Sequence, residues 1–212
     1  MKFHVVTLFP PMFESYLKES IIGRAITDKK IAVKFYNPRD YTTNKWGRVD
    51  GRPYGGGPGM VMEAQPVLAA VAKARGRKKI KTIIFSPAGK KLTNEYARSL
   101  LKKNKEIILI SGRYEGIDGR VKKILKAEEI SIGDYVLTGG ELPSMVLIDT
   151  VARQIKGVLN TFDSVEENRI SSSEVYTRPE VLKHKGKNYR VPKVLLSGHQ
   201  AKIEEWKKKD LQ

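Results

Sequence analysis

The chain has 212 residues, of which 40 are Lys or Arg and 23 are Asp or Glu, so its formal net charge is +17. It contains no cysteine, which excludes disulfides and thiolate metal sites, and no apolar run approaches the roughly 20 residues that span a bilayer. We therefore expect a cytoplasmic protein with no membrane partner, built as one large domain with or without a small appendage, whose positive charge suits a polyanion such as nucleic acid.

The N-terminal segment predicts a strand, a helix and a second strand. Residues 3–9 form a short apolar run, and we interpret it as a strand rather than a signal peptide because His4 and Thr7 interrupt it and two prolines follow it. Residues 12–26 have a helical pattern, and residues 31–36 form a second short, β-branched run.

The same alternation continues through the middle of the chain. Short buried strands are predicted at residues 82–86 and 107–111, and helices at residues 66–74 and 94–101, the last with Thr93 as its N-cap. Strands that alternate with helices predict an α/β domain with a mostly parallel sheet and helices on both faces.

A further helix is predicted at residues 143–155. Its apolar residues, among them Met145, Leu147 and Val151, occupy more than one face. A helix with this pattern is buried on two sides, and we expect one side to pack against a partner subunit.

The chain then changes character. Residues 160–173 are polar and without a clear period, which predicts a linker. Beyond it, short helices are predicted at residues 176–183 and 197–208, the second with a capping box of Ser197 and Gln200. Together they form a basic segment of about forty residues, which is too small to be very stable alone.

Positive charge is concentrated in two places. Residues 73–81 carry six Lys or Arg, and residues 183–212 carry nine Lys or Arg against three acids. A solvated surface explains such clusters as well as a nucleic-acid interface does, so the charge alone does not identify a ligand.

Three glycine-containing turns are the candidates for a ligand site. They lie at residues 86–89, 111–118 and 131–143, at or near the ends of predicted strands. Glycine lets a ligand approach the main chain closely, and ligands of open α/β sheets bind beyond the carboxyl ends of the strands. Each turn alone is equally well explained as a tight turn, but the three together favour one small-molecule site.

Other familiar sites are missing from the sequence. It has neither a G-x-x-x-x-G-K-[ST] phosphate loop nor a G-x-G-x-x-G dinucleotide turn. His4, His184 and His199 are scattered without metal-ligand spacing, so no metal centre is predicted from the residues.

Six motifs, in order along the chain, carry a specific resemblance. They lie at residues 50–60 (D-G-R-P-Y-G-G-G-P-G-M), 111–118 (S-G-R-Y-E-G-I-D), 131–143 (S-I-G-D-Y-V-L-T-G-G-E-L-P), 147–153, 176–180 (Y-T-R-P-E) and 194–206. In these motifs the chain resembles the bacterial tRNA (guanine-N1)-methyltransferase family over nearly its whole length. Members of that family use S-adenosylmethionine to methylate the guanosine just 3′ of the tRNA anticodon.

The resemblance implies a fold that the residue pattern alone does not predict. It is an α/β SPOUT methyltransferase domain with a parallel sheet and a trefoil knot, followed by a small helical C-terminal domain. Residues 1–159 would be the knotted domain that binds S-adenosylmethionine, residues 160–174 the linker, and residues 175–212 a basic domain that binds the tRNA anticodon stem-loop. The family forms homodimers with the active site at the interface, which agrees with a helix buried on two sides.

The resemblance also implies the cofactor contacts. Main-chain groups of Ile132, Tyr135 and Leu137 would hold the adenine, and Glu115 would accept from a ribose hydroxyl or engage a cation. The implied set is Pro87, Gly89, Gly112, Tyr114, Glu115, Gly116, Ser131, Ile132, Gly133, Asp134, Tyr135, Val136, Leu137, Gly139, Gly140 and Pro143. Mg²⁺ stays open as a second cofactor, with Glu115 or acids of the linker as its contacts.

Guanine N1 carries a proton, so its methylation needs a general base and a group that stabilises negative charge on O6. Arg153 matches the family's catalytic arginine. The base is either Asp163 or Glu167, because the linker T-F-D-S-V-E-E-N-R-I is shorter than the family pattern; residue type favours Asp163.

The implied tRNA contacts are Asp50 near the target guanine, and Arg178 and Lys183 on phosphates. Two alternatives stay open: an RNA-binding homologue that is catalytically weak or silent, and a SPOUT methyltransferase that acts on rRNA. The motifs at residues 50–60 and 176–180 argue against the second, because they resemble the tRNA-modifying family in particular.

Overall fold

The structure is a computed structural model that describes residues 1–159 and 174–209. The chain divides into two compact units, Met1–Leu159 and Asn160–Gln212. The first unit contains, in chain order, β1 (Lys2–Val6), η1 (Pro10–Phe13), α1 (Glu14–Leu17), α2 (Ser20–Thr27), β2 (Ala32–Tyr36), η2 (Pro38–Tyr41), β3 (Asp50–Gly51), β4 (Val61–Met62), α3 (Ala64–Arg75), β5 (Lys81–Lys91), α4 (Asn94–Lys103), β6 (Glu106–Ile110), α5 (Gly119–Leu125), β7 (Glu128–Ser131) and α6 (Glu141–Ala152).

A five-stranded parallel sheet forms the centre of this unit, in the strand order β2-β1-β6-β5-β7. The central strand β6 (E-I-I-L-I) is buried over its last four residues, as expected for a strand that helices cover on both faces. Because the strands are parallel, their carboxyl ends meet at one edge, where Ile110 pairs with both Val6 and Ile84. The predicted α/β class with a parallel sheet is confirmed.

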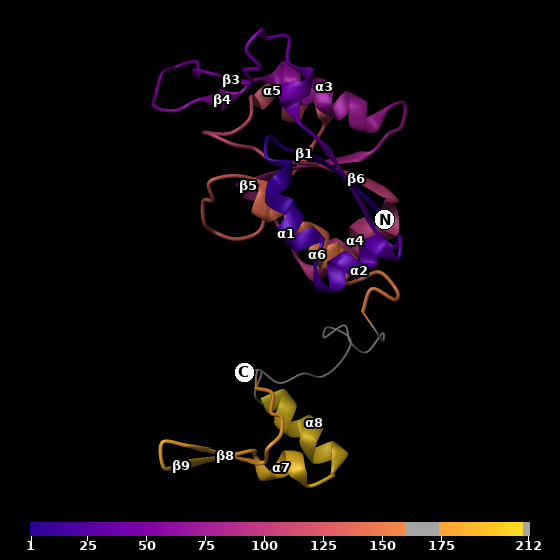
Figure 1. Ribbon diagram of the computed structural model, residues 1–212, viewed down its shortest axis with the longest axis vertical. Helices are drawn as coiled ribbons and strands as arrows, with labels where there is room; N and C mark the ends of the chain where they lie inside the picture. Colours follow the sequence, from indigo (N-terminus) through magenta and orange to yellow (C-terminus); the bar gives the residue numbers. More distant parts are fainter. Residues whose placement is uncertain (160–173, 210–212) are drawn as a thin grey trace. The chain divides into compact units, whose positions relative to one another are not determined.

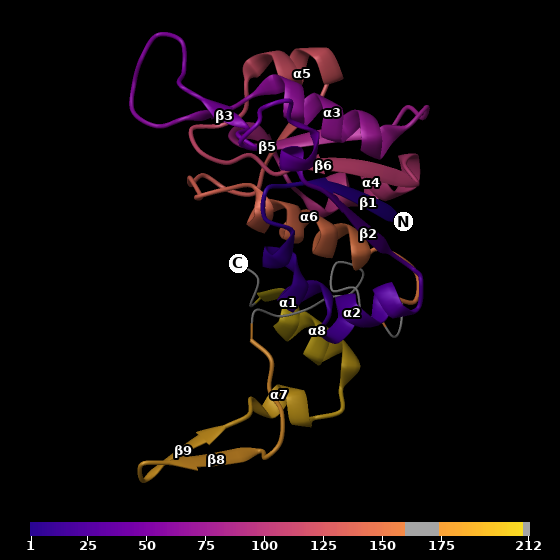
Figure 2. The same cartoon turned by 45° about the horizontal axis from the view of Figure 1, so that its top comes forward.

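Helices cover both faces of the sheet, which gives three layers (Figures 1 and 2). On one face, α1, α2, α4 and α6 share a core with Ile107 and Leu109 of β6. On the other face, α3 and α5 share a core with Ile108 and Ile110. Alternate residues of one strand therefore point into different cores, as the period of a strand requires.

Most of the predicted elements are present. The strands β1, β2, β5 and β6 and the helices α3, α4 and α6 lie where the sequence pattern predicts them. Thr93 caps α4 as predicted, since its hydroxyl accepts a hydrogen bond from Tyr96 N at 3.1 Å. β5 is longer than predicted, because it continues beyond a bulge between Phe85 and Lys90.

The helix predicted at residues 12–26 is instead divided into η1, α1 and α2. The break lies before α2, where Ser20 has a φ of 53°. Gly23 then comes so close to the Lys18 carbonyl that a Cβ there would lie 2.4 Å from its oxygen. The sequence pattern also missed α5 and β7, two short elements of which β7 (E-E-I-S) has only one apolar residue.

The second unit contains an antiparallel hairpin and two helices, which are β8 (Val181–His184), β9 (Lys187–Arg190), α7 (Lys193–Leu196) and α8 (Gln200–Lys209). The helix predicted at residues 176–183 is wrong, because residues 181–184 form β8. Lys185 and Gly186 both have positive φ, as the two-residue turn of a hairpin requires. Both strands are largely exposed, so no hydrophobic alternation marked them.

The helix predicted at residues 197–208 corresponds to α8, but its predicted capping box is wrong. Ser197 Oγ donates to the carbonyl of Val194 at 2.7 Å, and Gln200 Nε2 donates to Glu204 at 3.2 Å. Ser197 thus ends α7 rather than starting α8.

Candidate active site

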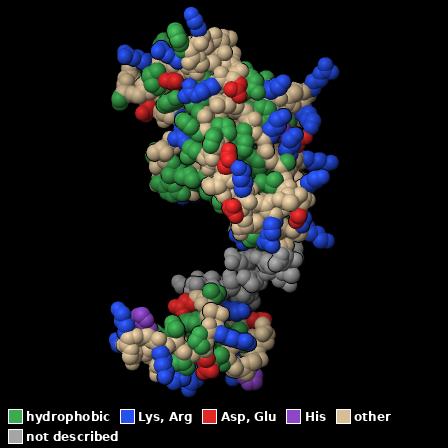
Figure 3. Space-filling view, in the orientation of Figure 1, with side chains coloured by type: hydrophobic (Ala, Val, Ile, Leu, Met, Phe, Trp, Pro, Cys, Tyr) green, Lys and Arg blue, Asp and Glu red, His purple; other side chains and the backbone are tan. Residues whose placement is uncertain are grey.

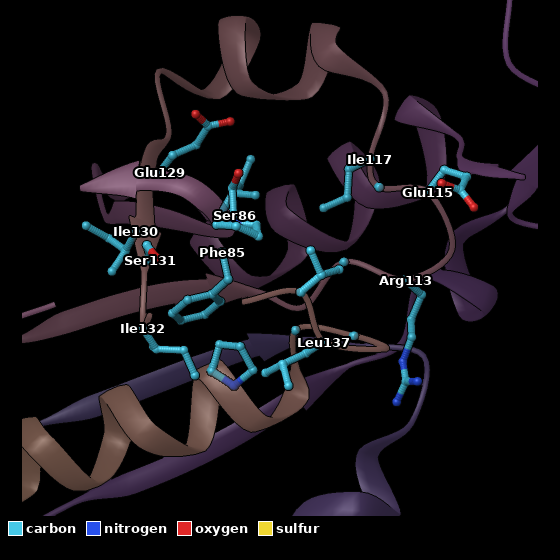
Figure 4. A pocket seen from close by; sticks show the side chains of 18 of the residues that line it. Phe85, Ser86, Arg113, Glu115, Ile117, Glu129, Ile130, Ser131, Ile132 and Leu137 are labelled. Carbon is cyan, nitrogen blue, oxygen red and sulfur yellow. The ribbon is translucent and has the colours of Figure 1, made fainter. Parts of the chain in front are cut away.

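A pocket of about 350 Å³ opens at the carboxyl ends of β5, β6 and β7, and its volume lies in the range of small-molecule sites. Its walls come from three segments. Residues 84–87 lie at the start of the bulge in β5, residues 112–119 follow β6, and residues 129–133 and 135–140 are the end of β7 and the turn after it. Figure 4 shows the side chains of Phe85, Ile132 and Leu137 gathered on one side of this pocket. The site therefore has an apolar side.

All the predicted cofactor contacts except Gly89 and Asp134 line this pocket. Gly89 lies at the β5 bulge, where a Cβ would be 2.6 Å from Ile130 N, so packing explains the glycine. Asp134 pairs with Lys91 at 2.7 Å, and both side chains are exposed. The structure thus brings together residues from three separate turns, while the ligand that they bind stays a prediction.

The glycines at the end of the third turn are required by close contact. Gly140 N donates to the Gly112 carbonyl at 2.8 Å, and a Cβ on Gly140 would lie 2.6 Å from Ser111 Cα. A Cβ on Gly139 would lie 2.5 Å from Arg113 Nε. Two walls of the pocket therefore touch main chain to main chain, and only glycine fits between them.

A buried ion pair, which the sequence analysis did not identify, holds the same two walls. Arg113 Nε lies 2.9 Å from Glu141 Oε2, and the two side chains are 16% and 1% exposed. Thr7 Oγ1 donates to the other oxygen of Glu141 at 2.7 Å, and the guanidinium lies over the Phe9 ring, 4.6 Å from its centroid. Among the described residues, Arg113 Nε and Glu141 Oε2 make no well-directed hydrogen bond, so their contact is an ion pair in which charge rather than direction provides the attraction.

The only signal for this pair in the sequence is an acid that follows two glycines at the start of an apolar helix. Glu141 opens α6 in this way. Its partner Arg113 is distant in sequence, so the pairing depends on the tertiary fold.

The rim of the pocket is joined to a long excursion of the chain, residues 42–60. Val61 pairs with Tyr114 and Met62 with Ile117, and Glu115 N donates to the Met60 carbonyl at 2.9 Å. In Figure 4, Glu115 lies at the edge of the pocket, away from Phe85. Asp50, a predicted tRNA contact, is on β3, which pairs with β4 and is thereby tied to this rim.

One carboxylate of the lining has a strongly shifted pKa. Hydrogen bonds from the side chain of Arg120, and then from its amide, lower the pKa of Asp118 to about 2. Asp118 also caps α5, so it is ionised at neutral pH and its role is local support of the wall.

Arg153, the predicted catalytic arginine, does not line the pocket. Arg153 is the C-cap of α6, at the opposite end from Gly140; with a rise of about 1.5 Å per residue the two are separated by about 20 Å. Asp163 and Glu167 lie outside the described residues. Arg178 and Lys183, the other predicted tRNA contacts, are exposed in the second unit.

The helix α6 has one buried and one uncovered side. Leu147, Ile148 and Val151 are fully buried against the sheet, whereas Leu142 and Val146 are 50% and 42% exposed. With Met12, Ser15, Tyr16, Met145, Asp149 and Thr150, these two exposed residues line a groove. The predicted burial of the second side is therefore not met within the single chain.

Tyr16 and Asp149 join the two sides of this groove, because the Tyr16 hydroxyl donates to Asp149 Oδ2. Burial and then this hydrogen bond raise the pKa of Tyr16 to about 12.

Neither a metal cluster nor a membrane helix is found in the part of the chain that the structure describes. Residues 1–159 and 174–209 contain no group of three or more His, Cys, Asp or Glu that could hold a metal ion. In the same residues, no helix has both the length and the apolar character needed to cross a bilayer.

Known proteins resemble this chain over its whole length. The family model described as "tRNA (Guanine-1)-methyltransferase TrmD" matches residues 1–212. Proteins named "tRNA (guanine-N(1)-)-methyltransferase" are similar to it: that of Ruminiclostridium cellulolyticum is 50% identical over 98% of this chain and 89% of its own length. That of Pseudoalteromonas atlantica is 48% identical over 98% of this chain and 78% of its own, and that of Buchnera aphidicola from Acyrthosiphon pisum 45% identical over 98% and 88%.

Proposed function

Because the chain belongs to the tRNA (guanine-1)-methyltransferase family and is a tRNA methyltransferase, we propose that it methylates N1 of the guanosine just 3′ of the anticodon. S-adenosylmethionine is the proposed methyl donor. The observation that carries the proposal is the pocket at the strand ends, lined by nearly all of the residues that match the family's cofactor motif.

The pocket suits an adenosine with a sulfonium group. Ile132, Tyr135 and Leu137 line the pocket, and their main-chain groups would bind the adenine, while Pro87 and Pro143 would form the apolar slot around it. The crowding at Gly139 and Gly140 supports this fit, because it leaves main-chain groups rather than side chains at the wall. When bound, S-adenosylmethionine supplies a methyl group on a good leaving group.

The protein's part in the chemistry concerns the guanine. A carboxylate of residues 160–173, Asp163 or Glu167, would accept the N1 proton. Negative charge then gathers on O6, where the Arg153 guanidinium would stabilise it through a charged hydrogen bond. Both roles are proposals from the family resemblance.

The separation of about 20 Å along α6 supports a homodimer in which one subunit's pocket works with Arg153 of the other. The uncovered side of α6 and its groove provide an apolar surface for a second copy. Figure 3 shows hydrophobic side chains gathered on the left margin of the first unit, where the turn with Tyr135, Val136 and Leu137 lies, and these three are 53%, 83% and 37% exposed.

The finer features of the resemblance belong to the same proposal. They are the trefoil knot, a cytoplasmic location, a linker at residues 160–174 and a tRNA-binding role for the basic second unit with Arg178 and Lys183. Mg²⁺ would be held by Glu115 or by acids of the linker. The names of the relatives favour neither a silent RNA-binding homologue nor an rRNA methyltransferase.

The proposed reaction is tested with anticodon stem-loop transcripts. We expect labelled methyl groups from S-adenosylmethionine to enter a stem-loop with guanosine at the target position and not one with adenosine there. Binding should also weaken steeply with added salt, as phosphate contacts require. Equal labelling of both transcripts would contradict the proposal.

The shared site is tested by mixing two inactive variants. Arg153→Ala removes the arginine, and Leu137→Asp blocks the pocket at a partly exposed position. If the site is shared across a two-fold dimer, each mixed dimer has one intact site, and activity recovers to roughly a quarter of wild type. No recovery after confirmed subunit exchange would contradict the shared site.

A further inference from the structure

Two aromatic side chains are exposed on the excursion of residues 42–60, which we call the arm. Trp46 is 75% exposed and Tyr54 is fully exposed. An exposed indole leaves about 150–250 Å² of mostly apolar surface in water, so its position needs a reason. Neither residue has a part in the proposed chemistry.

Trp46 lies on a turn that several hydrogen bonds fix, and its side chain is exposed to solvent. Its amide donates to Asn44 Oδ1 at 2.8 Å, and Gly47 N donates to the Asn44 carbonyl at 3.0 Å. Thr42 Oγ1 closes the turn by donating to the Arg48 carbonyl at 2.8 Å. By contrast Tyr54 precedes Gly55, Gly56 and Gly57, all with positive φ and open space around them. The turn therefore presents the indole in a defined place.

Positive charge lies beside the indole and along the arm. Lys45 Nζ lies 5.5 Å from the centroid of the Trp46 ring, and the arm also carries Arg48 and Arg52 against a single acid, Asp50. Within the described residues, none of these three cations forms an ion pair. An aromatic face on a segment with several cations that form no ion pair matches a nucleic acid strand, in which bases alternate with phosphates.

The C-terminal part of the arm is tied to the rim of the pocket. Asp50 and Gly51 pair with Met62 and Val61, and Val61 pairs in turn with Tyr114 of the pocket wall. Figures 1 and 2 show the arm around β3 extending away from the sheet. A nucleotide whose base enters the pocket would therefore have its neighbours near the arm.

We propose that Trp46 binds tRNA by stacking on an unpaired base of the anticodon loop, with Lys45 and the arginines of the arm near the adjacent phosphates. The inference rests on the proposed function, because a target base must leave its stack to be methylated and loop bases are then free to stack on aromatic side chains. Residue 46 lies just before the motif that begins at Asp50, so this contact is additional to those implied by the family motifs.

Tryptophan fluorescence tests the contact directly. Titration with the anticodon stem-loop should quench the tryptophan fluorescence of the wild type. In Trp46→Phe, the share of this quenching that comes from Trp46 should be absent. Removal of a stacking partner typically weakens binding by roughly 5- to 150-fold, which we expect for Trp46→Ala. Trp46→Phe should stay close to wild type because it keeps an aromatic face, and Trp46→Leu should bind as weakly as Trp46→Ala.

A fully paired RNA duplex of equal length is the control ligand. It offers phosphates but no unpaired base, so its affinity should be the same for wild type and Trp46→Ala. Trp46→Leu with wild-type affinity would show an apolar contact instead and overturn the proposal, as would equal quenching of wild type and Trp46→Phe.

Cofactor affinity separates the two levels of inference. If wild type binds S-adenosylmethionine and methylates the stem-loop while Trp46→Ala binds that RNA as tightly as wild type, the stacking contact is wrong and the proposed function stands. If wild type neither binds the cofactor nor methylates the stem-loop, the proposed function itself fails.

Discussion

The two ends of the central sheet are built from the same strands but differ in how their loops are held. At the carboxyl ends, glycine turns meet main chain to main chain and enclose a pocket, with the Glu141–Arg113 pair buried between them. At the amino ends, Glu106 of β6 forms a hydrogen bond with His4 of β1 at 2.9 Å and an ion pair with Lys78, while Glu128 of β7 forms an ion pair with Lys81 of β5. These acids are 22% and 29% exposed, against 1% for Glu141.

The difference teaches where a substitution affects function and where it affects stability alone. A change in the turns at the carboxyl ends moves the walls of the pocket. A change at the amino ends removes partly solvated charges that lie a strand's length from the pocket, which for a five-residue strand is about 16 Å. Changes at the first end should therefore alter cofactor affinity, and changes at the second should alter only the free energy of unfolding.

The largest effect is expected for Gly140→Ala, in the affinity for the cofactor. The added Cβ would lie 2.6 Å from Ser111 Cα and 2.8 Å from Gly112 N, and these main-chain atoms move only if the two walls separate. We expect cofactor affinity to fall roughly 100-fold, because a displacement of about 1 Å in a site has effects of this size. Calorimetric titration with S-adenosylmethionine measures it.

Gly119→Ala is the matched control at the same pocket. Gly119 lines the pocket, but an added Cβ meets no atom within 4 Å. Its affinity should stay within about twofold of wild type. Equal losses in both variants would mean that the contact at Gly140 is not what shapes the pocket.

The second-largest effect is expected for Glu141→Gln, in the free energy of unfolding. The substitution keeps the shape of the side chain but leaves the largely buried Arg113 without its counter-charge, which should lower the free energy of unfolding by about 3 kcal/mol. Urea unfolding at pH 7 measures the change. Since the pair also joins two walls of the pocket, cofactor affinity should fall in the same variant.

Arg113→Met in addition to Glu141→Gln separates charge from packing. With both charges gone, no unpaired ion is buried, and part of the lost stability should return. A double variant that is less stable than Glu141→Gln alone would show that packing and hydrogen bonds, rather than the charge of Arg113, dominate at this position.

The sequence predicts what depends on local pattern. The apolar β-branched runs of β1, β2, β5 and β6 and the helical period of α3, α4 and α6 are local, and so is the Thr93 cap. In β7, two acids interrupt the apolar pattern that would indicate a strand. The β8–β9 hairpin is exposed and needs no hydrophobic face. In both cases hydrophobicity carries no signal.

In the candidate site too, the sequence predicts the local features and not those that depend on the tertiary fold. The glycine turns could be recognised because each is a short local motif, and residues of all three line the pocket. The Glu141–Arg113 pair could not, since it joins residues from different elements and its strength comes from burial that only the fold creates. The distance from Gly140 to Arg153 likewise follows from α6 being one continuous helix.

A smaller effect is expected at the other end of the sheet, for Glu106→Gln. Glu106 is 22% exposed and pairs with an exposed lysine, and pairs of this kind contribute about 1 kcal/mol or less. The free energy of unfolding at pH 7 should fall by about that amount, while cofactor affinity should equal that of wild type. A large loss of affinity would contradict the separation of the two ends.

The smallest effect is the pH dependence of the difference in the free energy of unfolding between wild type and Glu106→Gln. Hydrogen bonds from Lys78 and then His4 lower the pKa of Glu106 from 4.5 to about 2. Because the folded pKa is below the unfolded one, the ionised carboxylate stabilises the fold above about pH 4.5, and this stabilisation is lost as the pH falls towards 2. Glutamine does not titrate, so the stability difference between wild type and Glu106→Gln should shrink through this range. Asp118, whose pKa is also about 2, is present in both proteins and cancels in the comparison. Urea unfolding of both proteins at steps from pH 7 to pH 3 measures the difference, and a constant gap would mean that shape rather than charge joins these strands.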